Sequence, residues 1–235
     1  MDAALVLGRL DLAGASYQLT DFRIELERQR AALCEMSTEE PVPVGGSALI
    51  SLGRWGELYP VAAVEVTRCQ QVGDRLFEIE AVGLVRRLLN RPVQEQMRAV
   101  TAEAALAKLA VGAGLIFLSL APPIPSQPRD MVFCGSLRGA LDQVALCFGQ
   151  TTERWHLNIE GKKLLLLPGY APGVPTEIGS ELIFESRADE FESVILPRLR
   201  PFARLQYQGA ARTVDRVAFD AKWQSMTVTL VPETT

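Results

Sequence analysis

The stretch LTDFRIELER, residues 19–28, decides the fold class of this chain, because its apolar and polar residues alternate one by one. Phe22, Ile24 and Leu26 fall on one side, and the charged residues between them fall on the other. A period of two is typical of a β-strand with one buried and one exposed face. We therefore expect a half-buried strand here, with carboxylates on its outer face.

The rest of the first third continues this β pattern. PVPVGGSALISLG, residues 41–53, predicts a turn followed by a short strand. VAAVEVTRCQQVGDRLFEIEAVG predicts a hairpin with strands at 61–69 and 75–82, a turn at residues 72–74, and Phe77 and Ile79 facing inward. Short strands joined by glycine-bearing turns favour a small barrel or sandwich.

The middle of the chain changes to a helical period. TAEAALAKLAVGAG predicts a helix capped by Thr101 and ended by Gly112 or Gly114, and GSLRGALDQVALCFGQ predicts a second one capped by Ser136. A hairpin, RWHLNIEGKKLLLLPG, is expected to follow with its turn at Glu160-Gly161. We expect these elements to form a small α/β unit.

After a proline-rich and glycine-rich linker, PGYAPGVP at residues 168–175, the sequence returns to β. Five short strands are expected, at 181–186, 193–196, 203–208, 213–220 and 224–231. The predicted fold is mainly β with an α/β insert: two small tube-like β-barrels flank a helix-hairpin unit. The predicted domains are 1–91, the first barrel, 92–169, the insert, and 170–235, the second barrel.

Composition limits the function. The 235 residues are 48% hydrophobic and 22% charged, which predicts a folded protein that buries some apolar surface against partners. A net charge of −4 argues against general nucleic-acid binding, which needs a broadly cationic surface. The first residues lack a signal-peptide pattern, and the longest apolar run, residues 113–123, is too short to span a membrane. We expect a soluble protein made in a cytoplasm.

The four cysteines, at positions 34, 69, 134 and 147, have no CxxC spacing, and His156 is the only histidine. Each cysteine has apolar neighbours in the sequence, so we expect four buried free thiols. A zinc or iron–sulfur site assembled from distant cysteines stays open, but the spacing does not favour one. No cofactor or metal is expected.

Enzyme signatures are absent from the sequence. GxSxG, HExxH, GxxxxGK[ST] and a GxGxxG after a strand do not occur. His156 falls inside an expected strand and is interpreted as structural or solvent-facing rather than catalytic. Glu78 and Glu80 alternate with Phe77 and Ile79, which predicts an outer strand face rather than a pair of catalytic carboxylates. We expect no enzyme.

A basic stretch, RLRPFARLQYQGAARTVDR at residues 198–216, contrasts with the acidic chain, because it holds five arginines against one acid, Asp215. It is either a solvated face or a docking face for an acidic surface, which the chain itself supplies. The candidate subunit-interface residues are Glu25, Glu27, Glu78, Glu80, Arg198, Arg200, Arg204, Arg212 and Arg216.

The order of these modules resembles the tail and baseplate hub proteins of bacteriophages, a family related to the N-terminal part of type VI secretion spike proteins. The resembling segments are YQLTDFRIELERQRAALCEM in the first barrel, TAEAALAKLAVGAGL and FCGSLRGALDQVALCFGQTTERWHLNIEGKKLLLLPG in the insert, and ILPRLRPFARLQYQGAARTVDRVAFDAKWQSMTVTL in the second barrel. LPRLRPFARL looks like the P-x-L-x-P-G step into that barrel, and Phe202 stands where the family often has glycine.

This resemblance implies a structural virion protein at the phage tail tip, assembled in the bacterial host cytoplasm. It implies a homotrimer whose six barrels form a pseudo-six-fold ring. The implied partners are the tail tube or distal tail protein ring, the tip or spike proteins and the tape-measure protein, with no membrane and no sequence-specific nucleic acid. The alternatives are a tail-associated cell-wall hydrolase and a carbohydrate-binding β adhesin that uses Trp55, Trp155 and Trp223.

Overall fold

The computed structural model describes residues 5–28, 30–54, 57–119, 127–149, 155–157, 163–166 and 176–231. The chain divides into two compact units, Met1–Leu84 with Gly173–Thr235, and Val85–Pro172. The predicted fold class, mainly β with an α/β insert, is confirmed. The division into domains at 1–91, 92–169 and 170–235 stays a prediction, and the β segments from the two ends of the chain lie in one unit.

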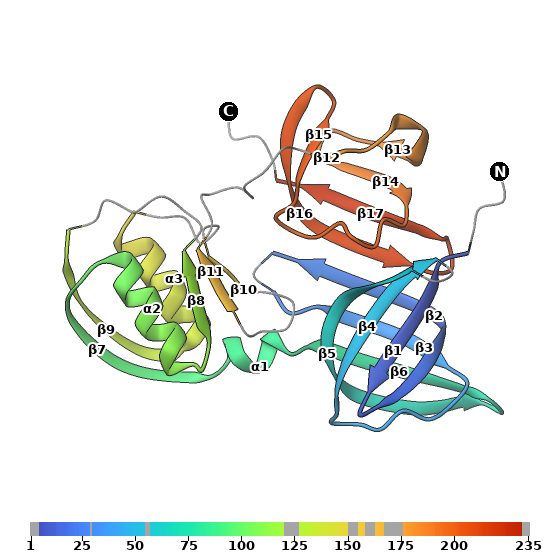
Figure 1. Ribbon diagram of the computed structural model, residues 1–235, viewed down its shortest axis with the longest axis horizontal. Helices are drawn as coiled ribbons and strands as arrows, with labels where there is room; N and C mark the ends of the chain where they lie inside the picture. Colours follow the sequence, from blue (N-terminus) through green and yellow to red (C-terminus); the bar gives the residue numbers. More distant parts are fainter. Residues whose placement is uncertain are drawn as a thin grey trace. The chain divides into compact units, whose positions relative to one another are not determined.

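Six antiparallel strands at the start of the chain form a closed barrel (Figure 1). They are β1 (Leu7–Leu12), β2 (Ala15–Glu27), β3 (Leu33–Thr38), β4 (Ser47–Arg54), β5 (Glu57–Gly73) and β6 (Leu76–Gly83). The order β1-β4-β5-β6-β3-β2 returns to its start, because β2 also pairs with β1. Closure of a sheet removes the unpaired edges that an open sheet would expose.

Strand β2 confirms the period-two prediction and explains how the barrel closes. Phe22, Ile24 and Leu26 are buried, and the residues between them are not. The first part of β2 pairs with β1, and the part from Leu19 onward pairs with β3. A register shift between Leu19 and Asp21 lies where these partners change. Such a bulge bends a strand and lets it serve two neighbours.

The C-terminal strands extend the same sheet to twelve strands. They are β12 (Thr176–Glu177), β13 (Ile183–Ser186), β14 (Glu190–Val194), β15 (Arg204–Tyr207), β16 (Ala210–Asp220) and β17 (Ser225–Leu230), with a short 3₁₀ helix, η2 (Ser180–Leu182), before β13. Each of the five predicted strands overlaps an observed one, but the strand expected at 193–196 begins earlier, as β14. Strand β16 pairs with β2, so that Phe219 lies opposite Ile24. Within the described part of the chain, the ladder of this second module stays open between β12 and β13.

One hydrophobic core joins the two β modules. Leu10, Ile24 and Ile50 from the barrel belong to the same buried cluster as Phe219 and Val228 from the C-terminal strands. Each such side chain contributes about 1.5–3 kcal/mol when it is fully buried. The β modules are therefore stabilised as one body.

The insert contains α1 (Val85–Leu89), β7 (Pro92–Val100), α2 (Ala102–Gly112), β8 (Ile116–Ser119), β9 (Arg129–Ser136), α3 (Leu137–Cys147), β10 (Trp155–Leu157) and β11 (Lys163–Leu166). The two predicted helix caps are confirmed, since Thr101 accepts from the amide of Ala104 and Ser136 from that of Gly139. Strand β7 pairs with β9, and β11 pairs with β10 and β8.

Two predicted features of this region, the turn at Glu160-Gly161 and the linker at residues 168–175, lie outside the described residues. No helix in the described part of the chain is long and apolar enough to cross a membrane.

Candidate functional site

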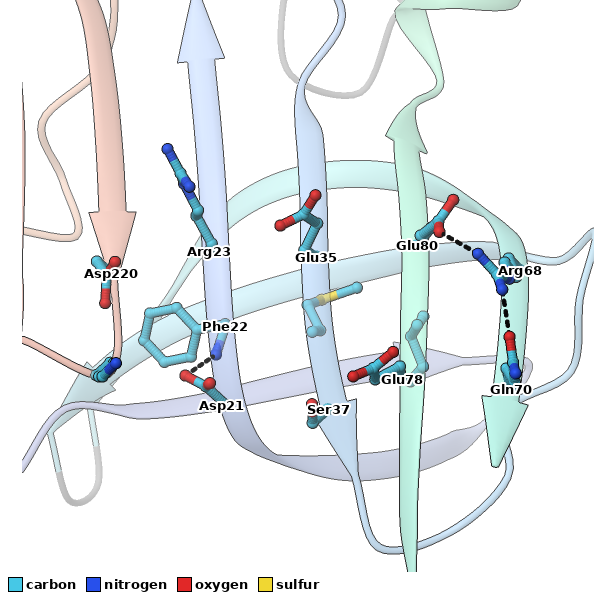
Figure 2. A pocket seen from close by; sticks show the side chains of 13 residues that line it. Asp21, Phe22, Arg23, Glu35, Ser37, Arg68, Gln70, Glu78, Glu80 and Asp220 are labelled. Atoms are coloured by element: carbon cyan, nitrogen blue, oxygen red, sulfur yellow. Dashed lines mark hydrogen bonds and ion pairs between the residues drawn. The ribbon is translucent and has the colours of Figure 1, made fainter. Parts of the chain in front are cut away.

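The outer face of the barrel carries two rows of polar side chains across β5, β6, β3 and β2. Register pairing aligns the first row and continues it to the end of β16: Arg68, Glu80, Glu35, Arg23 and Asp220. The second row is Gln70, Glu78, Ser37 and Asp21. With Lys222 these residues line a hollow of about 450 Å³, which we call the polar trough (Figure 2). Its floor is the barrel core, where Phe22, Met36 and Ile79 are buried.

Carboxylates outnumber cations in the polar trough. Arg68 binds Glu80 with 2.8 Å between Nη1 and Oε1 (Figure 2). Glu35 lies directly opposite Glu80, and like charges in that arrangement are unfavourable. Among the described residues, none forms a hydrogen bond or ion pair with the side chains of Glu35 or Glu78. The trough therefore presents two carboxylates, Glu35 and Glu78, that form no ion pair with any residue the structure describes.

The first arginines of the basic stretch contact β5 of the same chain. Arg198 donates from Nη2 to the hydroxyl of Tyr59 at 2.8 Å, and its guanidinium lies 4.2 Å from the centre of that ring. Arg200 donates to three backbone carbonyls, those of Leu199, Pro197 and Pro60. Burial lowers the pKa of the Arg200 guanidinium to about 10, because the charged form loses hydration. This segment acts as a clamp between the C-terminal strands and the barrel.

The later arginines also find partners within the chain. Arg212 donates from Nη2 to Asp189 Oδ1 at 2.5 Å and to the carbonyl of Val231 at 2.8 Å. Arg216 pairs with Glu25 at 2.9 Å between Nη2 and Oε1, which joins β16 to β2. Arg204 lies half-buried on β15. Arg198, Arg200 and Arg216 thus hold the two β modules together, whereas Arg212 pairs within the C-terminal module.

The acidic candidates divide into two groups. Glu25 and Glu27 lie on β2 and pair with arginines of the same chain, Glu25 with Arg216 and Glu27 with Arg30. Glu78 and Glu80 are exposed in the polar trough. The contact of all nine candidate residues with a second subunit stays a prediction.

Phe202 has a backbone conformation that favours glycine. Its φ is +71°, a left-handed conformation that glycine adopts without cost. The residue is only 5% exposed, and the Arg28 guanidinium lies 5.7 Å from the centre of its ring. Arg28 in turn binds Asp215 with 2.6 Å between Nε and Oδ1. Burial of the ring therefore offsets a strained backbone at the step into the second module.

Three contacts could not be predicted from the sequence: Arg198 with Tyr59, Arg212 with Asp189, and Arg28 with Asp215. The partners are far apart in the chain, so no local sequence pattern indicates these contacts. One sequence feature did indicate the positive φ of Phe202: the family that the chain resembles often has glycine at this position.

The cysteine prediction needs one correction. Cys34 is buried, Cys69 and Cys147 are half-buried, and Cys134 is exposed; all four are free thiols. Met131 and Phe133 on β9 face the insert core, so the alternation of the strand turns Cys134 outward. The described residues contain no group of His, Cys, Asp and Glu side chains that could hold a metal ion.

His156 and the three tryptophans are the candidates for catalysis and for sugar binding. His156 lies on β10, opposite Leu165 of β11. Of the three tryptophans, Trp223 is 69% exposed in the turn between β16 and β17, with the Lys222 ammonium 5.3 Å from its ring. Trp55 and the side chain of Trp155 lie outside the described residues.

No family model and no curated protein matches the chain. Solved structures do. The 43 kDa tail protein of prophage MuSo2 from Shewanella oneidensis matches 96% of this chain and 97% of its own, with a TM-score of 0.69 at 10% identity. A tail protein from Neisseria meningitidis matches 97% of this chain and 97% of its own, with a TM-score of 0.69 at 10% identity.

The E. coli c3393 protein, a component of the type VI secretion system, is also similar. The match covers 96% of this chain and 77% of that one, with a TM-score of 0.60 at 10% identity. At such low identities the likeness shows the fold. This chain has the fold of phage tail and type VI secretion proteins, and the architectural resemblance inferred from the sequence is confirmed.

Proposed function

We propose that this chain is a structural hub of a phage tail tip or baseplate, or of a related injection machine. In this proposal three copies form a ring of pseudo-six-fold symmetry that joins the tail tube to the tip proteins. The observation that carries it is the length of the fold match, which covers nearly all of this chain and of two tail proteins. The match includes both β modules and the insert between them.

The arrangement of the strands supports a ring. Each chain contributes two β modules to one twelve-stranded sheet, so three chains contribute six. Such a ring can match six-fold tube components on one side and three-fold tip components on the other. The barrel is closed, so its contacts with neighbours would use side chains of its outer faces. The polar trough is the charged, hollowed part of such a face.

The proposed role is non-catalytic, and the partners are the tail tube or distal tail ring, the tip or spike proteins and the tape-measure protein. The place of action is the virion. Release of sugar or peptide fragments from purified cell wall by the isolated protein would instead support the cell-wall hydrolase.

Electron microscopy of the purified protein at high concentration tests the proposal. We expect rings with three-fold symmetry whose rim shows six similar lobes, one for each β module. Particles without rotational symmetry, alone and after addition of purified tail tubes, would contradict the proposed role as a hub.

A further inference from the structure

The turn between β5 and β6 carries exposed side chains suited to a protein contact. Val72 is 45% exposed and Leu76 is 40% exposed. Arg75 lies between them in the turn, and no described residue forms a hydrogen bond or ion pair with its side chain. We call residues 72–76 the hairpin tip. It combines apolar surface with a cation that pairs with none of the described residues, a composition that suits docking against carboxylates.

The polar trough has the complementary composition. No described residue forms an ion pair with Glu35 or Glu78, and Glu35 faces Glu80 across the strands. Arg23, on the other side of Glu35, pairs with Glu25 instead. A guanidinium placed between them would neutralise this repulsion and satisfy carboxylate oxygens in a fork geometry. Figure 2 shows Glu35, Glu78 and Glu80 around the open part of the trough.

We propose that the hairpin tip of one copy docks into the polar trough of the next copy, with Arg75 among Glu35, Glu78 and Glu80. This inference rests on the proposed self-assembly and names its contact surface. A second copy is the occupant because the chain carries both complementary halves. The contact is head-to-tail, and contacts of that kind close into rings when the rotation between copies allows it.

Within one chain, positions 74 of the tip and 37 of the trough are too far apart for a disulfide. Ser37 of the trough lies opposite Glu78, whereas Asp74 of the tip lies four residues before Glu78 on the same hairpin. At the rise of a strand this separation is roughly 13 Å. A disulfide requires Cα atoms within about 7 Å. A disulfide between positions 74 and 37 therefore reports a contact between copies.

The test uses the full chain with Cys134→Ser, which removes the exposed thiol. Asp74→Cys and Ser37→Cys are made in separate proteins, so that Arg75 and the trough carboxylates remain. After mild oxidation of the mixture we expect a disulfide-linked pair of unlike chains. The matched control pairs Asp74→Cys with Gln18→Cys, an exposed position on β2 outside the trough. Cross-linking no greater than in this control would overturn the proposal.

Charge reversal gives a second readout that separates this inference from the proposed function. Arg75→Glu and Glu78→Arg should each weaken self-association about tenfold or more, because like charges then meet. The double variant should recover most of that loss. If the wild type is a trimer, both charge-reversal variants keep the trimer mass, and the cysteine variants do not cross-link specifically, the tip-to-trough contact alone is overturned. A wild-type chain that does not associate, together with cysteine variants that do not cross-link, would overturn both.

Discussion

The Arg216 guanidinium lies 2.9 Å from the Glu25 carboxylate, and this ion pair joins the last β module to the first within one chain. The two strands that carry it, β16 and β2, are adjacent in the sheet. A basic stretch that the sequence suggests as a docking face thus acts largely inside the subunit.

A double-mutant cycle of Glu25→Ala and Arg216→Ala should give a coupling of about 0.2–1 kcal/mol in the free energy of unfolding, the range for partly exposed pairs. Urea unfolding at two protein concentrations measures it, and the coupling should not depend on concentration. Zero coupling together with a change in molecular mass would show instead that the pair acts between subunits.

At position 202, a glycine variant should be more stable than an alanine variant, the reverse of the usual order of stability. Phe202→Ala loses the buried ring and should cost about 3–5 kcal/mol. Phe202→Gly loses the same ring but relieves the left-handed backbone, so it should be more stable than Phe202→Ala by about 1 kcal/mol. Thermal or urea unfolding checks this order.

Phe219, fully buried in β16, provides the control. At that position glycine should be less stable than alanine by about 0.5–1 kcal/mol, as is usual in strands. The same order at both positions would contradict the role assigned to the φ of Phe202.

Arg200 tests whether hydrogen bonding outweighs the cost of its buried charge. Arg200→Met keeps the length of the side chain but leaves the carbonyls of Pro60, Pro197 and Leu199 without this donor. We expect a loss of about 1–3 kcal/mol. Arg200→Lys should lose less, because an ammonium still donates. If Arg200→Met unfolds at the same urea concentration as the wild type, desolvation dominates and the proposed clamp is wrong.

The thiols should differ in reactivity. Exposed Cys134 should react with a thiol reagent at pH 8 within minutes, whereas Cys34 should react only on unfolding. Burial raises the pKa of the Cys34 thiol to about 12. Because the folded state holds this proton more tightly, the contribution of Cys34 to stability is complete below the ordinary thiol pKa of 9.0 and falls as the pH rises towards 12. Equal reaction rates for Cys34 and Cys134 would contradict the burial.

Local patterns predicted the elements, and long-range contacts decided the site. Strand β2 and the caps Thr101 and Ser136 follow from residues close together in the sequence. The pairing of β2 with β16 does not, because it depends on the shared core. That pairing places Arg216 against Glu25 and so changes the interpretation of the basic stretch.

The cysteine error has a local cause. Neighbours of Cys134 in the sequence are apolar, but strand alternation and not composition decides which side chains face the core. The polar trough shows the reverse case. Glu78 and Glu80 were predicted to face outward, but the hollow also depends on strand pairing, which places Glu35 beside them.

Molecular mass in solution, measured by light scattering at low and high salt, tests the central claim most directly. Three copies of the 25.7 kDa chain give about 77 kDa. The account predicts this mass at low salt and a shift towards 25.7 kDa at high salt, because charged contacts between copies are screened. A mass of 25.7 kDa at every concentration and at both salts would contradict it.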